Sequence, residues 1–318
     1  MSARDSAVSR PGSLDTARRL ETARPRYGEL AIAGVLFACA LVSVLTTTGI
    51  VIALAEPTIE FFQAVSFKEF LTTTDWAPTF TPASFGVIPI VVGTLSVTFW
   101  ALLVAIPFGL GAAIFLSEYA GERSRRILKP ALEVLEGIPT IAYGFFALTF
   151  VTPLLRDLWF LGEEPALFNV LSAGLVMGVM ILPTVATISD DAMRAVPAGL
   201  REGAYALGGS RRVVATRVVV PAALSGIVAS FVLGFSRAIG ETVIVLLAAG
   251  AIPNLTLDPR ESVQTMTAFI AATGSGDIAT GTITYKTIFA VGSLLFVMTM
   301  IVNLISIRLV NRFREVYE

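Results

Sequence analysis

Two charged residues lie in a long apolar stretch of the chain. Arg237 and Glu241 are the only charged residues in the 40 residues from Val218 to Leu257. A charge at the centre of a membrane helix costs about 2.5–3.5 kcal/mol on insertion scales, so such residues usually pair or line an aqueous path. The arginine fork suits an oxyanion, and the i, i+4 spacing predicts that Glu241 contacts Arg237. The pair predicts an anion pathway, with an interfacial charge pair near the headgroups as the alternative.

Other polar side chains in apolar segments are weaker candidates. Ser236 and Thr242 flank the charged pair, and Tyr143 follows Glu136 in a different apolar segment. They could donate hydrogen bonds inside a pore, although lone hydroxyls in membrane helices more often bond to their own helix. Glu136 has two interpretations, either a partner for an arginine of the loop 190–217 or a solvated acid at a helix start.

The loop 190–217 holds a second group of polar residues. Its sequence predicts a short helix over residues 197–207, because proline suits the first turn and Gly208 can end the helix in a C-cap. On physical grounds this helix could fit a socket on a partner protein, or it could be an ordinary polar connector. The candidate contact residues are Arg201, Glu202, Gly203, Ala204, Tyr205 and Gly208.

Several chemistries are excluded by the residues that the chain lacks. It has no histidine and one cysteine, Cys39, which excludes His-based acid–base catalysis, His or Cys-cluster metal sites and internal disulfides. A net charge of −1 argues against nucleic-acid binding, which normally needs a basic face. No lysine follows a glycine, so the chain has no P-loop. We expect no catalytic, cofactor or metal site in this chain.

The elements that must position these residues are predicted membrane helices. The chain has 318 residues, 55% hydrophobic and 15% charged, with a mean hydropathy of +0.78, whereas an average soluble domain is about 25% charged. A membrane helix needs about 20 apolar residues. Six charge-free gaps have this size or more, so we predict an all-α membrane protein with six transmembrane helices. The gaps are 30–55, 76–117, 137–155, 165–189, 218–236 and 287–307.

Prolines and charges refine this assignment. Prolines crowd the start of the second gap, so its helix is expected to begin near Ile88, and the third helix is expected to begin within residues 130–138. We expect a helix in each of two external segments. The segment 56–87 should contain a short interfacial helix, and the segment 262–276 should form a surface or re-entrant helix.

The orientation follows from the basic residues. Of the 23 Lys and Arg residues, 18 fall on one side, which predicts that both termini are cytoplasmic. We expect residues 1–28 to form a disordered cytoplasmic tail and residues 29–318 to form the transmembrane domain.

Two motifs resemble known transporters. The order Glu202-x-Ala204-x-x-x-Gly208, followed after nine residues by Val218-x-Val220-Pro221, resembles the EAA motif of ABC importer permeases, with Gly203 in place of the usual second alanine. The segment Phe235-Ser-Arg237-Ala-Ile-Gly240-Glu241-Thr242 resembles phosphate-importer permeases. The pattern Trp76-x-Pro78 resembles the PstC-type subunit more than the PstA-type subunit.

The resemblance implies an assembly and a location. It implies a type I ABC importer permease in a prokaryotic plasma (inner) membrane, with multiple spans, surrounded by membrane lipid. Arg237, Glu241, Ser236 and Thr242 would line the phosphate pathway, and the helix with Glu202 would be the coupling helix. The implied partners are a PstA-like permease, two PstB-like ATPases that bind ATP and Mg, and an external PstS-like phosphate-binding protein. The alternatives are an ABC importer permease for sulfate or molybdate and a self-sufficient secondary transporter or channel.

Overall fold

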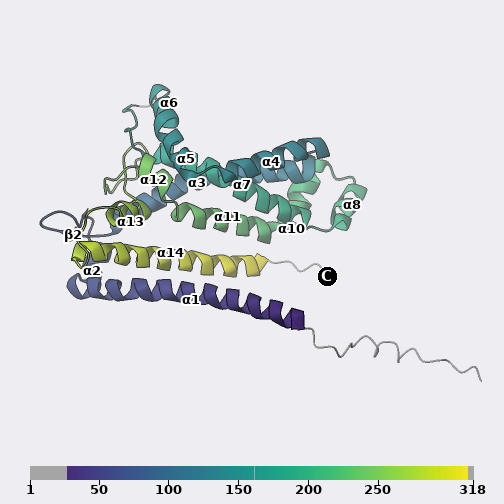
Figure 1. Cartoon of the computed structure of the whole chain (residues 1–318). Helices are drawn as coiled ribbons and strands as arrows, with labels where there is room; N and C mark the ends of the chain where they lie inside the picture. Colours follow the sequence, from purple (N-terminus) through teal and green to yellow (C-terminus); the bar gives the residue numbers. More distant parts are fainter. Residues whose placement is uncertain (1–26, 161, 314–318) are drawn as a thin grey trace, which may run out of the picture. The chain divides into compact units, whose positions relative to one another are not determined.

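The computed structural model describes residues 27–160 and 162–313, and helices dominate them (Figure 1). The predicted all-α class is confirmed; the described strands are two short ones that pair antiparallel, Trp76 with Phe85. In chain order the elements are α1 (Tyr27–Ala64), α2 (Phe67–Thr72), β1 (Trp76–Ala77), β2 (Ser84–Phe85), α3 (Ile88–Ile114), η2 (Phe115–Tyr119), α4 (Glu122–Gly137), α5 (Thr140–Phe146), η3 (Ala147–Val151), α6 (Thr152–Asp157), α7 (Val170–Arg194), α8 (Ala198–Ala206), α9 (Arg211–Val214), η4 (Ala215–Val219), α10 (Val220–Ala222), α11 (Leu224–Ile239), α12 (Val243–Ala248), α13 (Met266–Gly274) and α14 (Ile283–Phe313).

The chain divides into two units, Met1–Ala53 and Leu54–Glu318. In the first unit, the described residues are the N-terminal part of α1, whose apolar side chains are exposed, as a lipid-facing helix requires. Helix α1 begins at Tyr27, two residues inside the predicted tail. The rest of that predicted tail, residues 1–26, lies outside the described residues. The second unit holds every site considered below.

The candidate membrane spans agree with the six charge-free gaps. Four helices are long and apolar enough to cross a membrane, and two further pairs are bent by 89° and 72° at short breaks, which gives up to six spans. The first bent pair corrects one predicted boundary. Helix α5, which lies in the third gap, begins at Thr140 after a break at Ile138 and Pro139 rather than within residues 130–138, because the residue before a proline is disfavoured in the helical conformation. Helix α3 begins at Ile88, as predicted.

Helices α3 and α7 pack with their backbones in close contact. A Cβ atom added at Gly174 would lie 2.5 Å from the Trp100 Cβ, and one at Gly178 would lie 2.7 Å from the Ala101 carbonyl oxygen. Small residues allow this close approach, and the van der Waals packing that results favours the association of helices in lipid. The pair forms the centre of the main core cluster, with Met177 fully buried.

The remaining elements surround this pair. Helix α11 contacts α7, α3 and α14, and α13 contacts α14, α3 and α12. Because Met266 and Phe269 of α13 are buried, the segment 262–276 is not a surface helix. In the segment 56–87, the helix α2 buries Phe70 against Phe61 and Trp76, so this helix is anchored in a core cluster.

The loop between α12 and α13 carries one compact ion pair. The Arg260 Nε donates to both carboxylate oxygens of Asp258, at 2.9 and 3.0 Å, and the Arg260 Nη1 donates to the Glu163 carbonyl oxygen at 3.1 Å. The hydrogen bonds from Arg260 hold the pKa of the Asp258 carboxyl below its usual range. The pair ties this loop to the segment that follows α6.

Candidate functional site

Arg237 lies in the last turn of α11 and contacts two other helices. Its Nη1 donates to the Glu136 Oε1 at 3.0 Å and to the Thr184 Oγ1 at 2.9 Å. The Thr184 hydroxyl also donates to the Glu136 Oε1 at 3.0 Å. The Arg237 and Glu136 side chains are 33% and 42% exposed, so the guanidinium can exchange its partners without unpacking the helices. This arrangement can bind an anion reversibly.

Glu241 does not contact Arg237, so the predicted i, i+4 pairing is wrong. Helix α11 ends at Ile239 with Gly240 as its C-cap, and the helical spacing therefore does not extend to position 241. The Glu241 Oε1 instead accepts from the backbone amides of Val243 and Ile244, at 2.9 and 3.2 Å. Glu241 is 9% exposed and satisfies the free amides at the start of α12.

Glu136 matches neither of its two predicted roles. It occupies the last turn of α4 rather than a helix start, and its partner is Arg237 of α11 rather than an arginine of the loop 190–217. Both predictions missed the contact because 101 residues separate the two side chains. Glu136 thereby joins the end of α4 to the end of α11.

The candidate hydroxyls have other partners. The Ser236 Oγ donates to the Asn303 Oδ1 of α14 at 3.0 Å, and the Thr242 Oγ1 donates to the Gly240 carbonyl oxygen at 3.3 Å. The Tyr143 hydroxyl donates to the Leu135 carbonyl oxygen at 2.7 Å, which links α5 to α4 across the 89° break. The structure thus brings Glu136 and Thr184 to Arg237 and directs the Ser236 hydroxyl towards α14.

The predicted short helix in the loop 190–217 is α8. It begins after Pro197 and ends at Ala206, with Leu207 as its C-cap. Gly208 has a φ of +80°, the left-handed conformation that favours glycine after a helix. The prediction of this helix and its stop is confirmed. A Cβ at Gly203 would meet nothing within 4 Å, so the alanine usual in the motif would also fit there.

The two faces of α8 differ. Glu202, Gly203 and Tyr205 are exposed, and Leu207 beyond the helix is 92% exposed. Ala204 is half-buried and packs against the cluster around Val214. Arg201 also faces inward, with its side chain 21% exposed. The helix therefore exposes Glu202, Gly203 and Tyr205 and keeps Arg201 within the chain.

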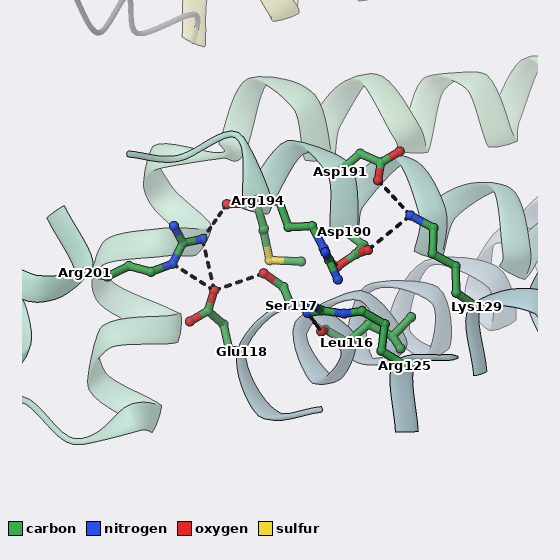
Figure 2. A network of polar contacts seen from close by, with 10 residues as sticks. Leu116, Ser117, Glu118, Arg125, Lys129, Asp190, Asp191, Arg194 and Arg201 are labelled. Carbon is green, nitrogen blue, oxygen red and sulfur yellow. Dashed lines mark hydrogen bonds and ion pairs between the residues drawn. The ribbon is translucent and has the colours of Figure 1, made fainter. Parts of the chain in front are cut away.

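Charged residues gather near the inward face of α8, where Arg201 is the member that α8 contributes (Figure 2). Glu118, at the end of α3, binds Arg201. Asp190 of α7 is 1% exposed and accepts from the Arg194 Nε at 2.9 Å, while the Lys129 Nζ of α4 lies 3.1 Å from the Asp191 Oδ1. These ion pairs join α8 to η2, and α4 to α7.

Two residues of these sites were not predicted. Thr184 carries no charge, and nothing local marks it as a partner for Arg237. Glu118 is one of the two charges that bound the second gap, but the gap alone does not assign it a partner. A carboxylate directly after a long apolar run is a signal for a buried ion pair at a membrane boundary.

A family model decides the class of the chain. Residues 105–315 match the family described as binding-protein-dependent transport system inner membrane component. The chain belongs to this family. The match covers α8, Arg237 and Glu136, so the predicted ABC importer permease class is confirmed, and a permease of this family is not itself a catalytic enzyme.

Relatives of this inner membrane component agree with the family match. The chain is 36% identical over 284 residues to a probable ABC transporter permease protein, YqgH, of Bacillus subtilis, covering 89% of this chain and 90% of that one. It is 34% identical over 274 residues to the phosphate transport system permease protein PstC of Pasteurella multocida, covering 80% and 82%.

Solved structures show the same fold. A bacterial ABC transporter for import of the acidic polysaccharide alginate matches with a TM-score of 0.61 at 17% identity, over 91% of this chain and 99% of that one. An inward-facing MetNI methionine ABC transporter matches with a TM-score of 0.52 at 18% identity, over 72% and 95%. At these identities the likeness concerns the fold, and it confirms the predicted ABC importer permease architecture.

Proposed function

We propose that this chain is the PstC-like permease subunit of an ATP-driven phosphate importer. The observation that carries the proposal is Arg237, a partly exposed guanidinium held by Glu136 and Thr184, in a chain similar to PstC permeases. A guanidinium can bind a phosphate through two parallel hydrogen bonds. Glu136 competes with the anion for the same donor, which keeps the contact reversible, as transport requires.

The role proposed for Glu136 replaces one predicted for Glu241. Because Glu241 caps α12, it supports the backbone that follows Arg237 and does not exchange with the anion. Ser236 and Thr242 remain candidate pathway residues in a secondary role, since each already has a hydrogen-bond acceptor.

The energy for import comes from other subunits in this proposal. Moving an anion inward opposes the membrane potential and costs about 2.3 kcal/mol per charge per 100 mV. Because the chain has no Gly-Lys pair, two PstB-like ATPases bind ATP and Mg in its place. The coupling region consists of Glu202, Gly203, Ala204, Tyr205 and Gly208; all but Ala204 are exposed and meet the ATPases, while Ala204 packs inward. A PstA-like permease supplies the other half of the pathway, and a PstS-like protein delivers phosphate. The 18 basic residues on one side support cytoplasmic termini.

The test is reconstitution of the four-component complex in lipid vesicles. ATP-dependent uptake of radiolabelled phosphate, unaffected by excess sulfate or molybdate, is the expected result. Uptake that sulfate or molybdate abolishes would assign the chain to another oxyanion. Uptake by this chain alone without ATP would contradict the proposal and favour a secondary transporter or channel.

A further inference from the structure

The inward contact of α8 is built around a buried carboxylate. Glu118 lies in η2, the turn that ends α3, and its side chain is 5% exposed. Its Oε1 accepts from the Arg201 Nε and Nη2 at 3.3 and 3.2 Å, and from the Ser117 Oγ at 3.0 Å (Figure 2). A carboxylate with so little contact with water needs this partner, because an unpaired buried charge is strongly unfavourable.

Arg201 also holds the end of α7. Its Nη1 donates to the Val196 carbonyl oxygen and its Nη2 to the Met193 carbonyl oxygen, each at 2.7 Å. Helix α7 ends at Arg194, and the last carbonyls of a helix lack partners within the helix and attract a cation. One guanidinium therefore joins α8 to the ends of both α3 and α7.

The other attachments of α8 are to α9 and η4, the elements that follow it in the chain. No residue of α8 is buried, and Ala204 is its half-buried contact with the neighbouring cluster. On its C-terminal side the chain continues through Gly208, in a left-handed conformation, and Gly209. Arg201 is therefore the side chain through which α8 bonds directly to the ends of α3 and α7, whereas its other contacts are with α9 and η4.

The structure assigns Arg201 and Glu118 as positioning residues that transmit movement of α8 to the α3–α7 pair. This inference rests on the proposed function, because it concerns an importer whose ATPases move α8. Arg201 does not serve as an ATPase contact in this role. Since α3 and α7 are in backbone contact at Gly174 and Gly178, a force applied at their joined ends moves both helices together.

Breaking the Arg201–Glu118 contact should uncouple phosphate import from ATP hydrolysis without stopping the hydrolysis itself. Glu118→Gln removes the charge that holds Arg201, and Arg201→Gln removes the fork that reaches all its acceptors. In either variant the exposed residues Glu202 and Tyr205 remain available to the ATPases. ATP hydrolysis should continue, while fewer phosphate ions are imported for each ATP hydrolysed.

The experiment measures both rates in vesicles that contain the full four-component transporter. We expect Glu118→Gln and Arg201→Gln to lower the ratio of phosphate imported to ATP hydrolysed at least fivefold, with ATP hydrolysis within twofold of the wild type. The double variant should be no worse than the poorer single variant, because both changes break one contact. The matched control is Arg156→Gln, which breaks the exposed Arg156–Glu164 pair at 3.1 Å and should leave the ratio unchanged.

Two results would overturn the inference. One is an unchanged ratio in assembled Glu118→Gln and Arg201→Gln complexes; the other is hydrolysis that falls in step with uptake, which would make Arg201 an ATPase contact. If these variants do not assemble, the same ratio is measured in Arg201→Lys, because lysine keeps the charge but cannot span the acceptors of Arg201. A lowered ratio supports the inference, and an unchanged ratio contradicts it. Amide hydrogen exchange of residues 198–207 can be measured in the complex without substrate. Faster exchange in Glu118→Gln than in the wild type supports the inference, and unchanged exchange contradicts it. This result is independent of the proposed function, because it holds even if the wild type imports sulfate.

Discussion

Replacing Arg237 with alanine tests the centre of the proposed pathway. The guanidinium donates two hydrogen bonds from Nη1, to Glu136 and Thr184, and the proposal requires it to bind phosphate in their place. A hydrogen bond to a charged group contributes about 1.5–3 kcal/mol, and each 1.4 kcal/mol is about a factor of ten. Arg237→Ala should therefore slow phosphate import by roughly 10- to 100-fold.

The loss should not come from unfolding. Because the Arg237 and Glu136 side chains are 33% and 42% exposed, their ion pair contributes only about 0–1 kcal/mol to stability, and the carboxylate left behind can be hydrated. Arg237→Lys keeps the charge without the fork, so an intermediate rate is expected.

The assay is ATP-dependent uptake of labelled phosphate, normalised to the amount of assembled complex. Arg156→Ala, which removes another arginine from an exposed ion pair, serves as the matched control and should import at the wild-type rate. If the Arg237→Ala complex assembles normally and imports phosphate at more than half the wild-type rate, Arg237 does not contact the substrate.

Three further predictions concern charge competition, packing and pH. Glu136→Gln keeps an acceptor but removes the competing charge, so labelled phosphate should bind the purified permease pair up to about fivefold more tightly; equal or weaker binding would contradict the competition. Gly178→Ala should destabilise the chain by about 1–3 kcal/mol through overpacking, seen as a lower Tm in detergent, while Gly111→Ala, where a Cβ meets nothing within 4 Å, should not. Because Arg260 lowers the pKa of Asp258, the stability that this carboxylate adds is present above the ordinary Asp pKa of about 3.9 and is lost as the pH falls through its lower folded value. The Tm difference between the wild type and Asp258→Asn should be constant near neutral pH and shrink below about pH 4; a difference that grows on acidification would refute this sign.

Features fixed by neighbouring residues were predictable from the sequence. The prolines before Ile88 placed the start of α3, and Gly208 placed the end of α8. Both depend on backbone restrictions that act within a few residues. The charge-free gaps likewise located the candidate spans, because the thickness of the bilayer sets their length.

Contacts between distant segments could not be predicted in this way. The i, i+4 rule assigned Glu241 to Arg237, but the rule fails once the helix ends, and Gly240 ends α11. The true partner, Glu136, is 101 residues away, and the choice depends on how α4, α7 and α11 pack. Spacing identified Arg237 as a residue of interest, and tertiary structure determined what it binds.

The glycine contacts between α3 and α7 also limit how the protein can change shape. At Gly174 and Gly178 the two helices leave no room for even one added carbon atom, so sliding one helix along the other would bring larger residues into this narrow space, and we expect the pair to move as one body. Alternating access requires elements with two discrete arrangements. In this chain we expect such elements at polar contacts that can exchange partners, such as that of Glu136, while α3 and α7 rotate together relative to the helices around them.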